Sequence, residues 1–105
     1  MSSLNYRRPN SVRIGTIPVE RAIHMTIRVL AFARLREILG VPEADLELPT
    51  GARVADAWAA LARGRAALEF ERSSTRAACN GSIVPFDAPL REGDEVAFLP
   101  PVGGG

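Results

Sequence analysis

Three stretches of this chain alternate hydrophobic and polar residues, as a strand with one buried face does. These stretches are residues 26–33, 44–49 and 95–99. In the last of them Val96 and Phe98 share one face, and the residues between them share the other. The pattern therefore predicts three strands, the last of which lies close to the C-terminus.

Two further stretches show helical spacing. In residues 34–39 apolar side chains recur three and four positions apart, and Gly40 follows, as is common where a helix ends. A longer helix is predicted over residues 53–63, with Asp56 in its first turn, where an acidic side chain suits the helix dipole. The core-facing stripe of this main helix consists of Val54, Trp58 and Leu61.

A hairpin is predicted after the main helix. Asn80-Gly81 separates residues 76–79 from residues 82–84, and Asn-Gly is a strong signal for a two-residue turn between strands. Residues 67–70 are expected to form an apolar turn that closes the core, and residues 71–75 a polar loop. The order of elements indicates the α+β class.

The ends of the chain differ from its middle. Residues 1–24 lack periodicity, and Gly15 and Pro18 interrupt their few apolar positions, so they are expected to form a flexible N-terminal extension. Residues 25–99 are expected to form the one folded domain, and residues 100–105 an exposed tail.

The tail has an unusual chemistry. Pro100 and Pro101 cannot continue a sheet, because neither donates a backbone N–H, and they favour an extended exit after Leu99. Val102 and the glycines Gly103, Gly104 and Gly105 follow. The tail therefore offers the unhindered α-carboxylate of Gly105, which could enter a channel too narrow for larger residues.

These residues carry a resemblance to a known family. Four motifs resemble the small subunit of molybdopterin synthase, a ThiS/MoaD-type ubiquitin-like sulfur carrier. They are Phe86-Asp87-Ala88-Pro89-Leu90, Gly93-Asp94-Glu95-Val96-Ala97-Phe98, Pro100-Pro101-Val102 with Gly104-Gly105, and, near the start, Phe32-Ala33-Arg34-Leu35-Arg36-Glu37-Ile38-Leu39-Gly40. The resemblance implies a β-grasp fold, in which a mixed sheet packs on one main helix and a flexible glycine tail follows. Arg53 departs from the family, where a Thr is expected to cap the main helix.

The resemblance also implies a function. An E1-like adenylyltransferase would use ATP to activate Gly105, and a cysteine desulfurase or rhodanese-like donor would supply sulfur for a thiocarboxylate. The large subunit of molybdopterin synthase, in a heterotetramer, would then transfer the sulfur to a cyclic pyranopterin phosphate. The family implies no stably bound cofactor, and the pterin site would lie in the large subunit.

Composition narrows the function classes. The net charge of +1 provides no strong field for nucleic acid or a membrane surface. One Cys excludes an internal disulfide, which suits the cytoplasm. All thirteen basic residues are Arg, so no side-chain amine of the chain could form an isopeptide with an activated tail.

The chain shows no catalytic or metal-binding constellation of its own. His24 is expected to be inert, and Cys79, in a predicted strand, is expected to be a small buried thiol and not the sulfur carrier. One His and one Cys form neither a Cys–His pair nor a zinc site. The chain is therefore expected to be a non-catalytic carrier.

A partner surface is expected around the last strand and the tail. Ala97 and Leu99 are apolar but alternate with the inward residues, and Phe86 is a weaker candidate for the same surface. Three other functions remain open: a sulfur carrier for thiamin or another thio-metabolite, a ubiquitin-like protein modifier, and an interaction domain with an inert tail. A thiocarboxylate at Gly105 would exclude the last of these.

Overall fold

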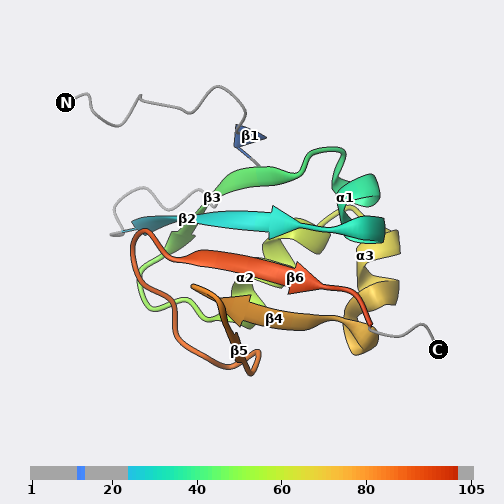
Figure 1. Ribbon diagram of the computed structural model, residues 1–105. Coiled ribbons are helices and arrows are strands. Elements are labelled where there is room, and N and C mark those ends of the chain that lie inside the picture. The colour runs from blue at the N-terminus through green and yellow to red at the C-terminus, as the bar shows by residue number, and fades with distance from the viewer. Residues whose placement is uncertain (1–11, 14–23, 102–105) are drawn as a thin grey trace.

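The computed structural model describes residues 12–13 and 24–101, which form one sheet with helices packed on it (Figure 1). In chain order the elements are β1 (Val12–Arg13), β2 (His24–Ala31), α1 (Ala33–Leu39), β3 (Glu43–Pro49), α2 (Val54–Ala62), α3 (Ala66–Glu71), a 3₁₀ turn (Arg72–Ser74), β4 (Arg76–Cys79), β5 (Ser82–Val84) and β6 (Glu95–Leu99).

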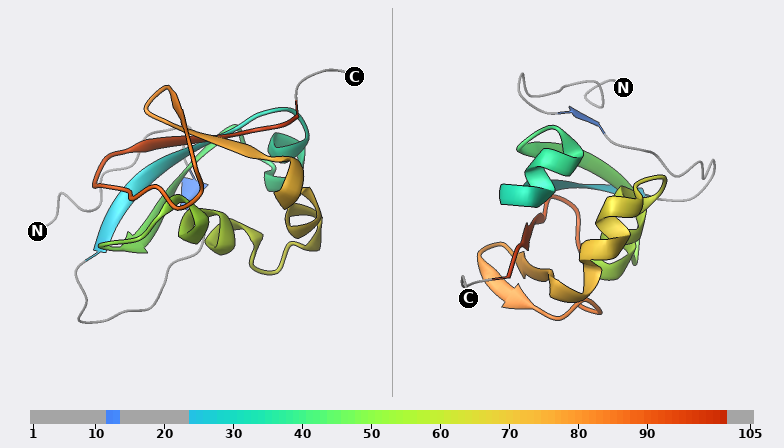
Figure 2. Two further views of the ribbon diagram at one scale, coloured as in Figure 1. Left: turned by 90° about the horizontal axis from the view of Figure 1, so that it is seen from below. Right: turned by 90° about the vertical axis from the view of Figure 1, so that its right-hand side faces the viewer.

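The sheet has the strand order β1-β3-β2-β6-β4-β5. The strands β2 and β6 pair in parallel at its centre, with Val29 opposite Val96 and Ala31 opposite Phe98. The helices α1, α2 and α3 all lie on one face of the sheet (Figure 2). We call the other face of the sheet its open face. The predicted β-grasp fold, with the last strand parallel to the first at the sheet centre, is confirmed.

The core lies between the sheet and the helices. Every second residue of β2, β3 and β6 is buried, as the alternation in the sequence predicts. Val96 and Phe98 are at most 1% exposed, and the rings of Phe98 and Trp58 meet edge to face with centroids 5.1 Å apart. Burial of these apolar side chains is the main term that stabilises the fold.

The main helix begins without the threonine that the family resemblance suggested. Arg53 precedes α2, and its backbone N–H donates to the Asp56 carboxylate at 2.8 Å. The next two backbone N–H groups donate to carbonyls of the loop 86–90, from Val54 to Ala88 at 3.0 Å and from Ala55 at 2.8 Å. Because the loop satisfies donors that a threonine would otherwise cap, Arg53 is tolerated here.

The expectation of a turn over residues 67–70 and a polar loop after it was wrong. Residues 66–71 form the helix α3, and a 3₁₀ turn continues it. Leu68 packs into the core, whereas Phe70 is 83% exposed. Two helical positions turn by roughly 200°, so the two side chains point in opposite directions.

Part of the N-terminal stretch lies against the sheet edge. Val12 and Arg13 pair in parallel with Ala44 and Asp45 of β3. His24 begins β2, two residues before the predicted start of that strand, and is exposed. The other residues of the predicted extension lie outside the described part of the chain.

The predicted hairpin at Asn80-Gly81 is confirmed. Both residues have positive φ, 51° and 90°, as a type I′ turn requires. The Asn80 side chain also joins the hairpin to the start of β6. Its amide nitrogen donates to Asp94 at 2.9 Å, and its oxygen accepts from the backbone N–H of Glu95 at 2.9 Å.

We expect Asn80→Ala to lower the free energy of unfolding by about 2 kcal/mol. The variant loses two hydrogen bonds, each worth about 1 kcal/mol, and alanine adopts positive φ less readily than asparagine. Urea denaturation should measure the loss, with the neighbouring exposed Ser82→Ala as control. Equal stability of the two variants would show that the side chain does not hold the hairpin to β6.

Candidate functional site

The start of the tail is held rigidly by the sheet. The strand β6 is paired with β2 up to Phe98 and with β4 up to Leu99, so the strand that leads into the tail is fixed on both sides. Pro100 is half-buried and Pro101 is exposed. The carboxyl end of β6 lies at the same end of the sheet as α1 and α3 (Figure 1). The predicted tail residues Val102, Gly103, Gly104 and Gly105 lie outside the described residues.

An apolar row crosses the open face next to this exit. Leu30 of β2 lies opposite Ala97 of β6, Ala97 lies opposite Ala78 of β4, and Ala78 lies opposite Ile83 of β5. Cross-strand partners project from the same face of a sheet, so these four side chains are neighbours. Ile83 is 54% exposed, which is unusual for a large apolar side chain.

Two more apolar residues extend the row toward the tail. Leu99, half-buried, lies one row further along β6, opposite Arg76 of β4. Phe32 follows β2 directly and is 43% exposed. We call the set the apolar patch, and it consists of Leu30, Phe32, Ala78, Ile83, Ala97 and Leu99.

Alternation within one strand predicted only part of this patch. The outward positions of Ala97 and Leu99 agree with the prediction from the β6 pattern. The other four members were missed, because they come from separate strands and only the sheet register brings them together. Their signal in the sequence was an apolar residue at an outward position, which is weak in a single strand.

Phe86 does not belong to the apolar patch. Its ring packs against the core ring of Phe98 at 5.9 Å and against Trp58 at 6.2 Å, on the helix side of the sheet. The guanidinium carbon of Arg72 lies 3.4 Å from the Phe86 ring centroid. The prediction that Phe86 shares a surface with Ala97 and Leu99 is therefore corrected, and the ring instead helps to close the core.

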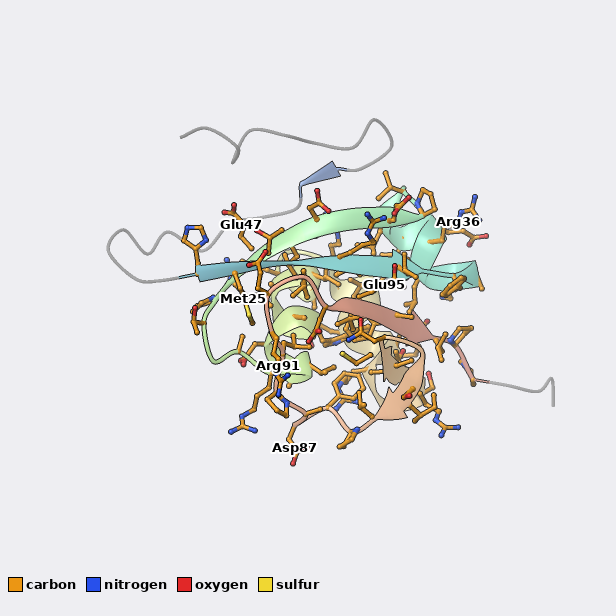
Figure 3. All side chains as sticks on the ribbon, turned by 60° about the vertical axis from the view of Figure 1, so that its left-hand side comes forward. Met25, Arg36, Glu47, Asp87, Arg91 and Glu95 are labelled. Atoms are coloured by element: carbon orange, nitrogen blue, oxygen red, sulfur yellow. The ribbon has the colours of Figure 1, made fainter. Side chains whose placement is uncertain are left out.

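The open face also carries a group of acidic residues. The outward residues of β3 are Glu43, Asp45 and Glu47, and Glu95 begins β6. Glu47 and Arg36 lie toward opposite ends of the sheet, with Glu95 between them (Figure 3). The acidic residues thus lie along β3 and at the start of β6, and Glu43 of β3 lies opposite Leu30, at the edge of the apolar row that runs beside the tail.

Cys79 is poorly suited to carry sulfur. Partial burial, followed by the charge of the Asp94 carboxylate and a hydrogen bond to it, raises the pKa of the Cys79 thiol. Burial alone would raise the pKa of Asp94, but hydrogen bonds from the Asn80 side chain and the Arg91 backbone outweigh it and lower that pKa. Asp94 is therefore charged at neutral pH and opposes a thiolate at Cys79.

Two other kinds of function, metal binding and membrane spanning, were considered for the described residues. Within residues 12–13 and 24–101, no three His, Cys, Asp or Glu side chains are grouped so that they could hold a metal ion. In the same part of the chain, no helix is both long and apolar enough to cross a membrane.

The sequence is similar to that of known sulfur carrier proteins. The model of the ThiS family matches residues 29–105, which include the glycine tail. The molybdopterin synthase sulfur carrier subunit of Escherichia coli strain K12 is 43% identical over 81 residues, covering 75% of this chain and 99% of the relative.

Solved structures share the fold. A putative molybdopterin converting factor subunit 1 from Pyrococcus furiosus aligns with a TM-score of 0.67 and 34% identity, over 74% of this chain and 99% of that chain. SAMP1 from Haloferax volcanii aligns with a TM-score of 0.66 and 29% identity, over 76% and 99%.

We expect the Cys79 thiol to react slowly with iodoacetamide at neutral pH, because the reactive thiolate forms only above the ordinary pKa of 9.0. The measurement is the alkylation rate against pH. The matched control is a chain with Cys79→Ala and Ser82→Cys, which carries an exposed thiol in the same hairpin. If the alkylation rate of Cys79 reached half its maximum at a pH equal to or lower than that of the control thiol, the raised pKa would be contradicted.

Proposed function

The chain belongs to the ThiS family, and from this membership we propose that it is the sulfur carrier subunit of a molybdopterin synthase. One observation carries the proposal. The curated Escherichia coli relative of that name matches this chain over 99% of its own length. The fold supports it, because β6 leads from the centre of the sheet directly into the proline and glycine tail.

The working atom is the terminal carbonyl carbon of Gly105. A carboxylate is a poor acyl donor, so an E1-like adenylyltransferase first joins it to AMP from ATP and releases pyrophosphate. The outer sulfur of a persulfide on a cysteine desulfurase or rhodanese-like protein then attacks the carbonyl and expels AMP, and a second thiol cleaves the resulting acyl disulfide, leaving a disulfide on the donor side and a thiocarboxylate on Gly105. The resulting thiocarboxylate donates its sulfur to a cyclic pyranopterin phosphate in the large subunit, which forms molybdopterin.

The carrier contributes position to this chemistry. The sheet holds the start of the tail at Leu99, and the two prolines favour an extended path away from it. The raised pKa of Cys79 leaves the tail as the better place for sulfur. No cofactor is needed in the carrier, and the single Cys suits a reducing cytoplasm.

The apolar patch is the proposed surface for the large subunit. Two members of the patch, Ile83 and Phe32, are exposed, and their exposure beside the reactive end is better explained by burial against a partner than by folding, since they contribute little to the core. A heterotetramer of two carriers and two large subunits would place each tail in a separate pterin site.

A second candidate function is protein modification. The similar Haloferax volcanii structure is that of SAMP1, and a further similar structure is described as a small archaeal modifier protein 1. A modifier would end in an isopeptide bond from Gly105 to a target lysine. A thiocarboxylate without conjugates would favour the carrier, and a ladder of conjugates would favour the modifier. A sulfur carrier for thiamin would form the thiocarboxylate but would not transfer its sulfur to the cyclic pyranopterin phosphate.

Gly105 deletion should abolish sulfur transfer, while the fold remains intact. Loss of one residue withdraws the carboxylate by about 3.5 Å, and reacting atoms must approach to about 3–3.5 Å. With the adenylating protein, ATP and a sulfur source, mass spectrometry should detect replacement of one oxygen by sulfur in the intact chain but not in the shortened chain.

Gly104→Phe keeps the length of the tail but adds a bulky ring, so this variant should react slowly or fail at pterin conversion. Normal thiocarboxylation and pterin conversion by both variants would rule out the carrier function.

Leu99→Glu should weaken binding to the large subunit about tenfold or more, because it places a charge in the centre of a buried apolar contact. Phe70→Glu is the matched control, since Phe70 is more exposed but lies on α3, away from the open face. Calorimetric titration with the large subunit measures both affinities. Equal affinity of the two variants would place the partner surface elsewhere.

A further inference from the structure

An arginine stands at the boundary between the acidic and apolar parts of the open face. Arg28 of β2 lies opposite Asp45 of β3 on one side and Glu95 of β6 on the other. One of its terminal nitrogens, Nη1, pairs with the Glu43 carboxylate. The Arg28 side chain is only 13% exposed, although it lies on the face that the described helices do not cover.

The second terminal nitrogen of Arg28 is an orphan. Its Nη2 atom is buried and has no hydrogen-bond partner in the described part of the chain. A guanidinium has five N–H donors and no acceptor, and it stays charged at any physiological pH. A buried charged donor without an acceptor is costly and rare, so an acceptor that reaches Nη2 would be favourable.

Arg28 also lines a cavity. It has a volume of about 240 Å³, room for one or two side chains, and Arg28 and Glu43 form part of its wall. Leu30 and Phe32, two members of the apolar patch, line it as well. The cavity is thus continuous with the surface proposed for the large subunit.

A second arginine stands at the mouth of the cavity. Arg36 of α1 also lines it, is exposed, and makes no ion pair with another described residue. Glu43 offsets the charge of Arg28, and Arg36 adds a second guanidinium at the α1 side. Glu95 lines the cavity too, and because Arg36 and Glu95 are both exposed, solvent screens both of these charges.

We propose that this cavity receives a carboxylate side chain of the large subunit. The carboxylate would accept from Nη2 of Arg28 at the base and from Arg36 at the mouth, while its methylene groups pack on Leu30 and Phe32. Guanidinium groups bind carboxylates through paired, charge-assisted hydrogen bonds, which suits two arginines that converge on one space. The inference rests on the proposed function, and it adds a polar anchor to an otherwise apolar contact.

Arg28→Lys isolates the orphan nitrogen. Lysine keeps the charge beside Glu43 but has a single nitrogen, so it cannot serve Glu43 and the incoming carboxylate in the same way. We expect affinity for the large subunit to fall about tenfold, the scale of one charge-assisted hydrogen bond. Affinity equal to that of the unchanged chain, in a variant with the same melting temperature, would overturn the proposal.

Arg36→Gln tests the charge at the mouth of the cavity. Because Arg36 is exposed and unpaired among the described residues, the variant should fold normally even if Arg28→Lys does not. We expect weaker binding and a smaller loss of affinity between low and high salt, since an ion pair has been removed. The control is Arg63→Gln, an exposed arginine after α2 on the helix side.

The salt series separates a carboxylate from a neutral acceptor. If Arg28→Lys binds weakly but Arg36→Gln matches the Arg63→Gln control at every salt concentration, the acceptor is a backbone carbonyl and the carboxylate proposal is wrong. Leu99→Glu separates this failure from failure of the proposed function. The chain could form its thiocarboxylate and lose affinity for the large subunit with Leu99→Glu but with neither arginine variant. That result would contradict the carboxylate contact at the cavity and leave the proposed function intact.

Discussion

The strands β2 and β6 pair in parallel, and this pairing fixes both the centre of the core and the exit of the tail. It puts the last strand at the sheet centre, where strands on both sides satisfy its backbone groups and its inward side chains fill the core. Two prolines and a glycine tail follow directly. A rigid strand therefore ends at a fixed point, and a slender segment continues from the centre of the sheet. Such an arrangement suits a chain whose terminal carboxylate is carried from one protein to another.

The same pairing arranges the open face. Because register matches residues across strands, the outward residues of five strands fall into rows, and these rows differ in chemistry. The row near the start of β6 contains Glu95, Arg28 and Asp45, whereas the row through Ala97 is apolar from Leu30 to Ile83 and begins at Glu43 of β3. An apolar contact provides affinity, and charged groups around it provide orientation and selectivity. Arg28 lies where these two parts meet.

Most elements of the fold were predictable from local patterns. Alternation over 44–49 and 95–99, the stripe of the main helix and the Asn80-Gly81 turn correspond to the observed strands, helix and hairpin. The helix α3 was not predicted, because six residues with one buried leucine show too little periodicity. Phe86 was misplaced for a related reason. Its burial depends on Trp58 and Phe98, which are distant in sequence.

Local sequence patterns account for the fold class, the residues that enter the core and the chemistry of the tail, because hydrophobic period, turn residues and glycines without side chains are local properties. Which outward residues are neighbours depends instead on how distant strands pair. The row from Leu30 to Ile83 joins four strands, and the cavity beside Arg28 needs β2, α1, β3 and β6 together. Strand register and helix placement create these neighbours through long-range packing, which no single stretch of sequence specifies.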